Sequence, residues 1–157
     1  MGRVVGTDTQ ALRARINAIL RVLLERTGAC RTTLRLDDPA LGFDINDVAG
    51  EALAPGAKSL RGQTSINQRA AATAQWIDRE RRLLVQGDLA RDEPRPPQPL
   101  IDLYGVKAQM LAPLVREGRL DGWISVHEAC GARSWSASDQ AAALQAAEEV
   151  LALLGSK

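Results

Sequence analysis

One short stretch, LDGWISVHEACGARSWSASDQ (residues 120–140), holds most of the side chains in this sequence that suit binding or catalysis. It contains the only histidine, His127, and two of the three tryptophans. If it begins as a β-strand, side-chain alternation places Trp123, Ser125 and His127 on one face. Their indole, hydroxyl and imidazole groups predict a site that orients a small polar or aromatic ligand. The alternative is structural, with His127 hydrogen-bonded to a backbone carbonyl at a strand end.

Arg69 and Trp76 are candidates from a second segment. Ser65 and Gln68 have capping-box spacing, and good helix formers follow, so the pattern predicts a helix over residues 66–82. Residues seven apart lie on the same helix face. Arg69 and Trp76 are therefore expected to form a pocket wall, in which Arg69 pairs with a carboxylate or phosphate of the ligand. The alternative is a core tryptophan beside a surface arginine.

Tyr104 and Gln109 complete the candidate binding residues. Tyr104 follows residues 91–99, which hold four prolines and predict a restrained crossing loop rather than regular structure. Such a loop holds Tyr104 as a cap over a pocket. Gln109 lies in an expected strand whose two faces are both mixed, so the pattern does not assign its direction.

The sequence contains no recognisable catalytic or metal-binding pattern. Cys30 and Cys130 lack the spacing of a metal motif, and one histidine does not complete a zinc site. A Gly-rich phosphate loop and a serine triad are also missing. We therefore predict no catalytic residue and no metal ligand, and an enzyme is the less favoured class.

Composition limits the partners. The 157 residues suit a single domain, 1–157, and 20 basic against 19 acidic residues give a net charge of +1. This balance argues against nucleic-acid binding, which needs a basic face. The chain has neither an apolar leader nor a long apolar run, so we expect no membrane association and a cytoplasmic protein.

Hydrophobic periodicity predicts the elements that position these residues. A helix is expected over 7–27, with Thr7 and Gln10 as a capping box and Gly28 as its stop. After it we expect a half-exposed strand with Arg31, Thr33 and Arg35 on its outer face. A weaker strand over 43–53 and a short strand over 83–89 come next. Residues 108–115 and 120–129 predict a hairpin. The last helix is expected over 136–154, with Ser136 and Asp139 as its capping box and an apolar stripe of Leu144, Ala147, Leu151 and Leu154.

This order of elements predicts an α+β layered domain. The terminal helices both carry apolar stripes, which lets them pack on one sheet face and against each other. Apolar surface on these helices that is left uncovered within one chain predicts an interface between two copies, and thus a homodimer.

Within residues 104–144 the order of short motifs resembles a GAF domain. The matching pieces are Ala112-Pro113-Leu114-Val115, Gly118, the strand from Leu120 to His127, Arg133-Ser134-Trp135-Ser136 and Asp139. The resemblance implies a central antiparallel sheet of about six strands with terminal helices on one face. It also implies that the middle helix and loops enclose a small-molecule pocket on the other face. The implied function is a sensory or regulatory module acting through a partner chain, with ligand and cofactor unknown.

Particular residues distinguish the different activities of GAF domains. Phytochrome-like bilin attachment needs a cysteine shortly before Gly105, and PLIDLY (residues 99–104) has none. The signature associated with cyclic-nucleotide binding is absent, whereas haem bound through His127 stays open. The alternatives are a cysteine-dependent reductase similar to free methionine sulfoxide reductase, using Cys30 or Cys130, and a ligand-free protein-interaction module.

Overall fold

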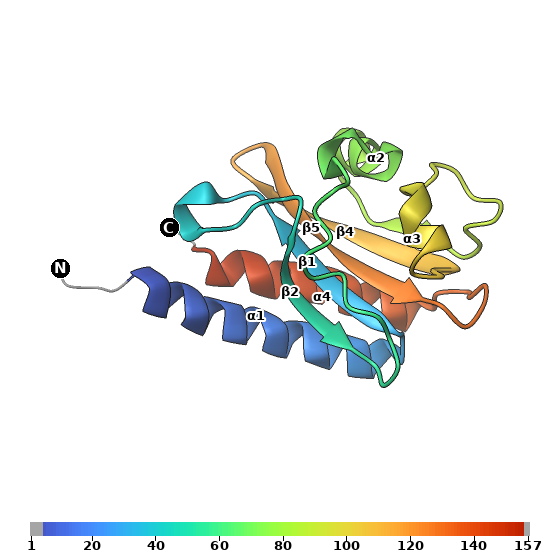
Figure 1. Cartoon of the computed structure of the whole chain (residues 1–157), viewed down its shortest axis with the longest axis horizontal. Helices are drawn as coiled ribbons and strands as arrows, with labels where there is room; N and C mark the ends of the chain where they lie inside the picture. Colours follow the sequence, from blue (N-terminus) through green and yellow to red (C-terminus); the bar gives the residue numbers. More distant parts are fainter. Residues whose placement is uncertain (1–4, 156–157) are drawn as a thin grey trace.

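A computed structural model of the chain describes residues 5–155 and contains one antiparallel sheet. Its strands are β1 (Arg31–Leu36), β2 (Val48–Leu53), β3 (Leu84–Gln86), β4 (Ala108–Arg116) and β5 (Arg119–Glu128). They lie in the order β2-β1-β5-β4-β3 (Figure 1). The α+β class and the antiparallel sheet are confirmed. The resemblance implied about six strands, and the described residues form five.

The helices divide between the two faces of this sheet. They are α1 (Val5–Thr27), α2 (Ala72–Glu80), α3 (Gln98–Asp102) and α4 (Ala137–Leu153), with single 3-10 turns at Pro39–Leu41 and Gln68–Ala70. The terminal helices α1 and α4 lie together on one face, and α2 and α3 lie on the other (Figure 1). Among the described residues, no helix has both the length and the apolar composition needed to span a membrane.

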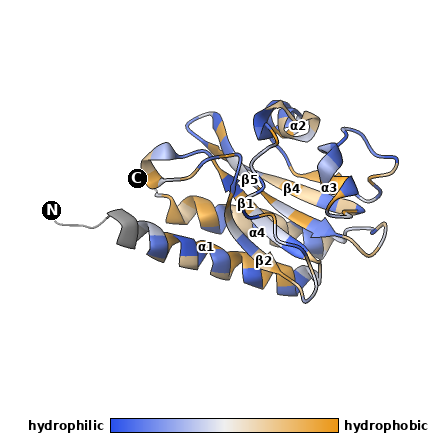
Figure 2. Ribbon diagram, in the orientation of Figure 1, coloured by the Kyte–Doolittle hydropathy of each residue, from blue (hydrophilic) through white to orange (hydrophobic). Residues whose placement is uncertain are grey.

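Helix α1 packs through the stripe that its sequence predicts. Hydrophilic and hydrophobic residues alternate along it (Figure 2), and Ile16, Leu20 and Leu23 are almost completely buried. The predicted start at Thr7 is wrong, because the helix already includes Val5. The predicted stop is confirmed: Gly28 adopts a left-handed φ of 66° and its N–H donates to the Leu24 carbonyl.

Helix α4 begins as predicted, and its predicted stripe is partly confirmed, because Ala147 is buried and Leu151 and Leu154 pack against the core. Ser136 and Asp139 form the reciprocal capping box. Leu144 is 45% exposed, so its predicted place in the core is wrong. The buried face is mostly alanine, with Ala142, Ala143, Ala146, Ala147 and Val150. Small side chains let α4 contact both β4 and α1, and the larger leucine points away from them.

The β4–β5 hairpin is confirmed and organises the centre of the sheet. Its two-residue loop, Glu117-Gly118, has positive φ at both positions, the geometry that suits a tight hairpin. Strand β5 pairs with both β1 and β4. Its Ile124 and Val126 join the core under the terminal helices, so the opposite face of β5 is free to form a site.

The predicted helix over 66–82 is wrong in its first half. A 3-10 turn at Gln68–Ala70 and an extended Ala71 (φ −65°, ψ 140°) precede α2, which spans only Ala72–Glu80. The expected cap at Ser65 does not form, because the Gln68 N–H donates instead to the Asn46 side chain. The break lets the Gln68 side chain turn into the protein, where it is 7% exposed.

Two other expectations change in detail. The weaker strand begins at Val48 rather than at residue 43, since the Asp44 side chain accepts the Asn46 N–H in a turn. The Pro-rich segment is irregular up to Pro97, and the short helix α3 then begins at Gln98. Pro97 precedes the helix and Pro99 lies in its first turn, where proline is tolerated.

Candidate functional site

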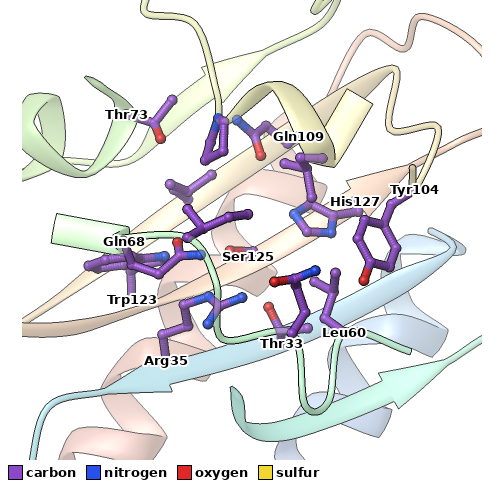
Figure 3. Close-up of a pocket in the computed structure, with 15 residues that line it drawn as sticks. Thr33, Arg35, Leu60, Gln68, Thr73, Tyr104, Gln109, Trp123, Ser125 and His127 are labelled. Atoms are coloured by element: carbon purple, nitrogen blue, oxygen red, sulfur yellow. The ribbon is translucent and has the colours of Figure 1, made fainter. Parts of the chain in front are cut away.

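A small enclosed cavity lies between the sheet and the segments opposite the terminal helices (Figure 3). Its floor comes from the sheet: Thr33, Arg35, Gln109, Leu111, Trp123, Ser125 and His127. Its cover comes from three segments: Leu60, Gln63, Ile66 and Gln68, then Thr73, then Pro97, Leu100 and Tyr104. We call this space the central cavity.

Strand register brings the polar residues of two strands together on the cavity floor. In the β1–β5 pair, Thr33 lies opposite Ser125 and Arg35 lies opposite Trp123. Directly opposed residues in an antiparallel pair point to the same face. Alternation alone assigns the polar face of β1 to solvent. In the structure it lies beside the polar face of β5, and both are buried under the cover of the cavity. The predicted half-exposed β1 is wrong, because all six of its residues are buried.

His127 is held in a single tautomer. Its Nδ1 accepts a hydrogen bond from Nε of Arg31 at 3.0 Å, and arginine carries only donors. The ring proton must then lie on Nε2, which leaves an N–H donor at the cavity wall. Burial, reinforced by the charges of Arg31 and Arg35, lowers the pKa of His127 well below 6.5 and keeps the ring neutral.

The neutral His127 predicts that the fold loses stability as the pH falls below 6.5. The unfolded chain takes up the imidazole proton near pH 6.5, whereas the folded pKa is lower. The free energy of unfolding should therefore fall by up to about 1.4 kcal/mol per pH unit below that point. Urea unfolding between about pH 7.5 and 5 measures this slope. His127→Gln leaves no other histidine and should flatten the slope, and equal slopes in both proteins would contradict the assignment.

Two buried arginines give the cavity region its electrostatic character. Arg31 is 2% exposed and donates to His127 and to the Lys58 carbonyl at 2.7 Å. Arg35 is 5% exposed and donates to the Ile45 carbonyl at 3.3 Å. Burial lowers the pKa of Arg35 to about 10, which still leaves it charged at neutral pH.

A chain of amides leads away from Gln109 on the cavity floor. Gln109 Nε2 donates to Gln86 Oε1 at 2.8 Å, and Gln86 Nε2 donates to the Pro94 carbonyl at 2.7 Å. Both glutamines are 1% exposed. The chain ties the cavity floor to the Pro-rich segment and fixes the hydrogen-bonding pattern of Gln109.

Carboxylates from β2 and the loop before it anchor the cover. Glu51 accepts hydrogen bonds from the Ser59 hydroxyl and the Leu60 N–H, and Asp47 accepts from the Gly62 N–H. Lys58 then joins this segment to the end of α3 by donating to the Leu103 carbonyl at 3.0 Å. The cover is thus held by polar contacts as well as by buried apolar side chains such as Leu60 and Ile77.

The central cavity is small, and a second pocket lies beside it. The cavity volume is about 40 Å³, against the ~300–1,000 Å³ of pockets for drug-sized ligands. The outer pocket measures about 280 Å³ and is lined by Cys30, Arg31, Lys58 and the turn at residues 54–57. Tyr104 lines both spaces. As it stands the cavity holds little more than a water molecule, and an organic ligand requires the cover to move.

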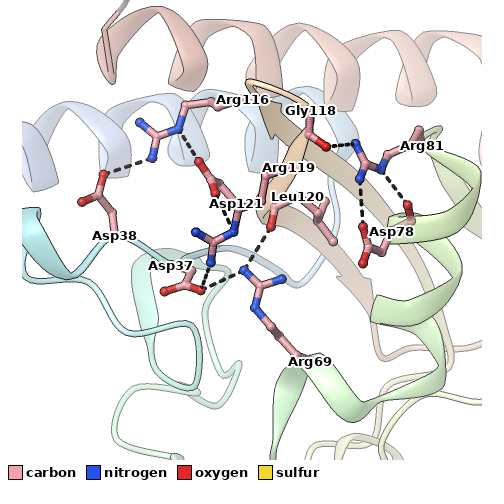
Figure 4. Close-up of polar contacts among 10 residues, drawn as sticks. All are labelled: Asp37, Asp38, Arg69, Asp78, Arg81, Arg116, Gly118, Arg119, Leu120 and Asp121. Atoms are coloured by element: carbon pink, nitrogen blue, oxygen red, sulfur yellow. Dashed lines mark hydrogen bonds and ion pairs between the residues drawn. The ribbon is translucent and has the colours of Figure 1, made fainter.

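Five of the seven predicted binding residues line the central cavity: Trp123, Ser125, His127, Gln109 and Tyr104. Arg69 and Trp76 do not. Arg69 lies outside α2 and donates to the Asp37 carboxylate at 2.8 Å and to the Leu120 carbonyl (Figure 4). Trp76 lies in α2 and is half-buried, with the Arg82 guanidinium 4.8 Å from its ring centre. The broken helix separates these two side chains from the cavity and from each other.

Sequence reasoning missed several cavity residues. Thr33 and Arg35 carried a signal, since they alternate with apolar neighbours on a strand, but alternation does not distinguish solvent from a polar cavity. No sequence signal marked the cover residues Leu60, Gln63, Ile66 and Gln68, because they lie in an irregular segment without hydrophobic periodicity. Only the tertiary fold places that segment over the sheet.

Cys30 and Cys130 come together at the end of the sheet, although they are far apart in sequence. Their sulfur atoms and a Glu128 carboxylate oxygen lie within 4.8 Å of one another, and Cys30 Sγ donates to Glu128 Oε2 at 3.2 Å. Burial raises the pKa of the Cys30 thiol. Arg133 binds the other Glu128 oxygen at 3.0 Å. This donor set is chemically able to hold a soft divalent metal or to form a dithiol pair.

Comparison with known proteins places this geometry in a family. The family model described as GAF domain matches residues 11–154. No curated protein matches the chain. Among solved structures, the PixJ GAF domain of Thermosynechococcus elongatus, in a blue-light-absorbing form, is similar. It has 20% identity and a TM-score of 0.67, and the match covers 98% of this chain and 92% of that one.

Two further structures share the fold. The chromophore-binding domain of a Stigmatella aurantiaca bacteriophytochrome has 17% identity and a TM-score of 0.70, over 98% of this chain and 60% of that one. A type II free methionine-R-sulfoxide reductase from Thermoplasma acidophilum has 12% identity and a TM-score of 0.69, over 93% and 94%. With the match over nearly all of its length, the sheet order and the terminal helices on one face, this chain belongs to the GAF domain family.

Proposed function

We propose that this chain is a sensory GAF domain that binds a small molecule in the central cavity and acts through a partner chain. The observation that carries the proposal is the polar lining of an enclosed space. Ser125, His127 and Gln109 are each at most 5% exposed, yet they line a cavity rather than packed core. Polar groups are buried at a cost unless they are hydrogen-bonded, so such a lining favours a polar ligand.

Native mass spectrometry of freshly purified protein tests this function. A chain carrying one retained small molecule is expected to be heavier than 16.9 kDa by the mass of that molecule. Ser125→Leu fills the cavity and His127→Ala removes a wall donor, so both should lose the molecule. Ser138→Leu makes the matched change at an exposed position of α4 and should retain it.

An unliganded chain that also binds nothing from a panel of metabolites would contradict the ligand-binding function. That result would favour the ligand-free protein-interaction module. Circular dichroism of each variant shows whether loss of the molecule reflects the cavity or a failure to fold.

A cysteine-dependent reductase is the second candidate, because the fold brings Cys30 and Cys130 together beside Glu128. The reaction would oxidise the two thiols to a disulfide and reduce a sulfoxide to a sulfide, with the oxygen leaving as water. Free methionine sulfoxide with dithiothreitol as the reductant is the probe. Turnover that disappears in Cys30→Ser and in Cys130→Ser supports this candidate, and its absence in the unaltered protein excludes that substrate.

We further propose a cytoplasmic homodimer formed through the terminal helices. Val22 on α1 and Leu144 on α4 are large apolar side chains that are 54% and 45% exposed, which makes them candidates for an interface. Light scattering should give twice 16.9 kDa, and a Val22→Glu, Leu144→Glu double variant should give 16.9 kDa. A mass near 16.9 kDa for the unaltered protein would end the dimer proposal.

A further inference from the structure

Arg35 is a buried charge without an acidic partner. Among the residues whose side chains the structure describes (9–155), no carboxylate oxygen lies within 4.0 Å of its guanidinium. Its single hydrogen bond to those residues goes to the Ile45 carbonyl, although a guanidinium carries five N–H groups. Asp47 and Glu51 favour the charged form of Arg35 from a longer distance, but neither forms an ion pair with it. Its unused N–H groups are therefore available to a negatively charged partner in the cavity.

Two half-buried arginines of this chain have carboxylate partners, whereas the buried Arg31 and Arg35 have none within 4.0 Å among the described residues. Of these two, only Arg35 lines the central cavity. Arg133 binds Glu128 and Asp139, and Arg116 binds Asp38 and Asp121. The two acids whose charges act on Arg35, Asp47 and Glu51, use their oxygens for other hydrogen bonds. Glu51 and Asp47 hold the cover through its backbone N–H groups.

The groups around Arg35 are donors as well. Figure 3 shows its guanidinium directed into the cavity, with His127, Ser125 and Thr33 around the same space. Because Arg31 occupies Nδ1 of His127, the ring offers only the Nε2 hydrogen. The two hydroxyls are free to rotate and donate. One positive charge and three donors around an enclosed space match the four acceptor positions of a carboxylate.

We propose that the central cavity binds a small organic carboxylate, with Arg35 as its charge partner and His127 as a second donor. This assignment rests on the proposed ligand-binding function. Trp123, Leu111 and Leu100 form the apolar part of the lining and accommodate a short hydrocarbon portion. The cavity of about 40 Å³ must widen by a shift of its cover to admit even acetate, which favours the smallest ligands. A bulkier phosphate ester is disfavoured for the same reason.

Titration with sodium acetate, propionate and butyrate tests the proposal. The readouts are Trp fluorescence and the melting temperature, at an ionic strength held constant with chloride. At least one acid should raise the melting temperature in a saturable way. Arg35→Met keeps the volume, removes the charge and should weaken that affinity at least tenfold (about 1.4 kcal/mol or more). Arg91→Met, at an 85% exposed side chain, is the matched control and should bind as the unaltered protein does.

Arg35→Met also separates this proposal from a structural role. Replacing an unpaired buried charge by an apolar side chain should leave the ligand-free protein as stable as before or more stable. If the variant unfolds, Arg35→Gln supplies the neutral polar comparison with the same expected loss of affinity.

The outcomes distinguish this inference from the function it rests on. Propionamide binding as tightly as propionate, carboxylate affinity unchanged in Arg35→Met, or tighter binding of inorganic phosphate each overturn the carboxylate assignment. If native mass spectrometry still shows a retained molecule, the ligand-binding function survives that result. If no probe binds and the chain is empty, both are wrong.

Discussion

Gly122→Ala is expected to destabilise this domain by about 3 kcal/mol or more, and at the extreme to prevent folding. Gly122 lies in β5, opposite Leu36 of β1 and Leu114 of β4. A Cβ atom there would overlap the backbone carbonyl oxygen of Arg35 and lie 3.1 Å from the Leu36 Cα. Backbone atoms of a central strand are unable to move aside without opening the sheet. The shift of the urea midpoint, followed by circular dichroism, measures the effect.

Gly131→Ala is the matched control for this change. Gly131 has no neighbouring atom within 4 Å of the added Cβ, and its φ is not in the left-handed region. It should change the unfolding free energy by less than about 0.5 kcal/mol. A Gly122→Ala protein as stable as Gly131→Ala would show that β1 and β5 do not approach as closely as described. Because that approach brings Arg35 next to Trp123, the cavity floor would be wrong too.

Leu20→Ala is expected to lower the free energy of unfolding by about 2–5 kcal/mol. Leu20 of α1 is 0% exposed and belongs to the main core under the sheet. Its carbonyl accepts the Thr32 hydroxyl at 2.8 Å, which ties α1 to β1 and limits how far the helix can collapse into the space left. Removing the side chain therefore leaves a cavity between the helix and the sheet. Urea unfolding gives the difference directly.

Leu144→Ala makes the same chemical change on α4 at a 45% exposed position. In the monomer it should lower stability by less than about 0.5 kcal/mol. Similar losses for the two variants would contradict the burial assigned to the terminal helices. A large loss for Leu144→Ala that grows with protein concentration would instead indicate that α4 lies in a dimer seam.

The two faces of the sheet are covered by different kinds of contact. Ile124 and Val126 of β5 are sealed under α1 and α4 by apolar packing. On the other face, Ser125 and His127 lie under a cover held by hydrogen bonds from Glu51 and Asp47 together with a smaller apolar cluster. The candidate site therefore lies on the face with the smaller apolar core.

Sequence reasoning succeeded where a local rule decides the structure. Twofold alternation placed Trp123, Ser125 and His127 on one face of β5, and the structure puts all three on the cavity floor. Capping chemistry located the start of α4 at Ser136, and Gly28 ended α1. Each of these rules depends on residues within a few positions of one another, so one sequence suffices to apply them.

It failed where a distant partner competes with a local preference. Residues 66–71 have the composition and cap spacing of a helix start, but Asn46 accepts the Gln68 N–H and the segment becomes part of the cover. Arg69 consequently pairs with Asp37 rather than facing a pocket. The outer face of β1 looked solvent-exposed because alternation reports only that one face is polar, not what covers it.

By itself, then, the sequence determined the α+β class, the order of most elements, the hairpin and the inward face of β5. These follow from the periodicity of side chains along a strand or helix and from caps at their ends. Only the tertiary structure decided that Arg35 is buried without an acid, that Cys30 meets Cys130 and that residues 58–68 cover the cavity. Those facts arise from the register of strands and the path of an irregular segment, which depend on contacts between residues far apart in the chain.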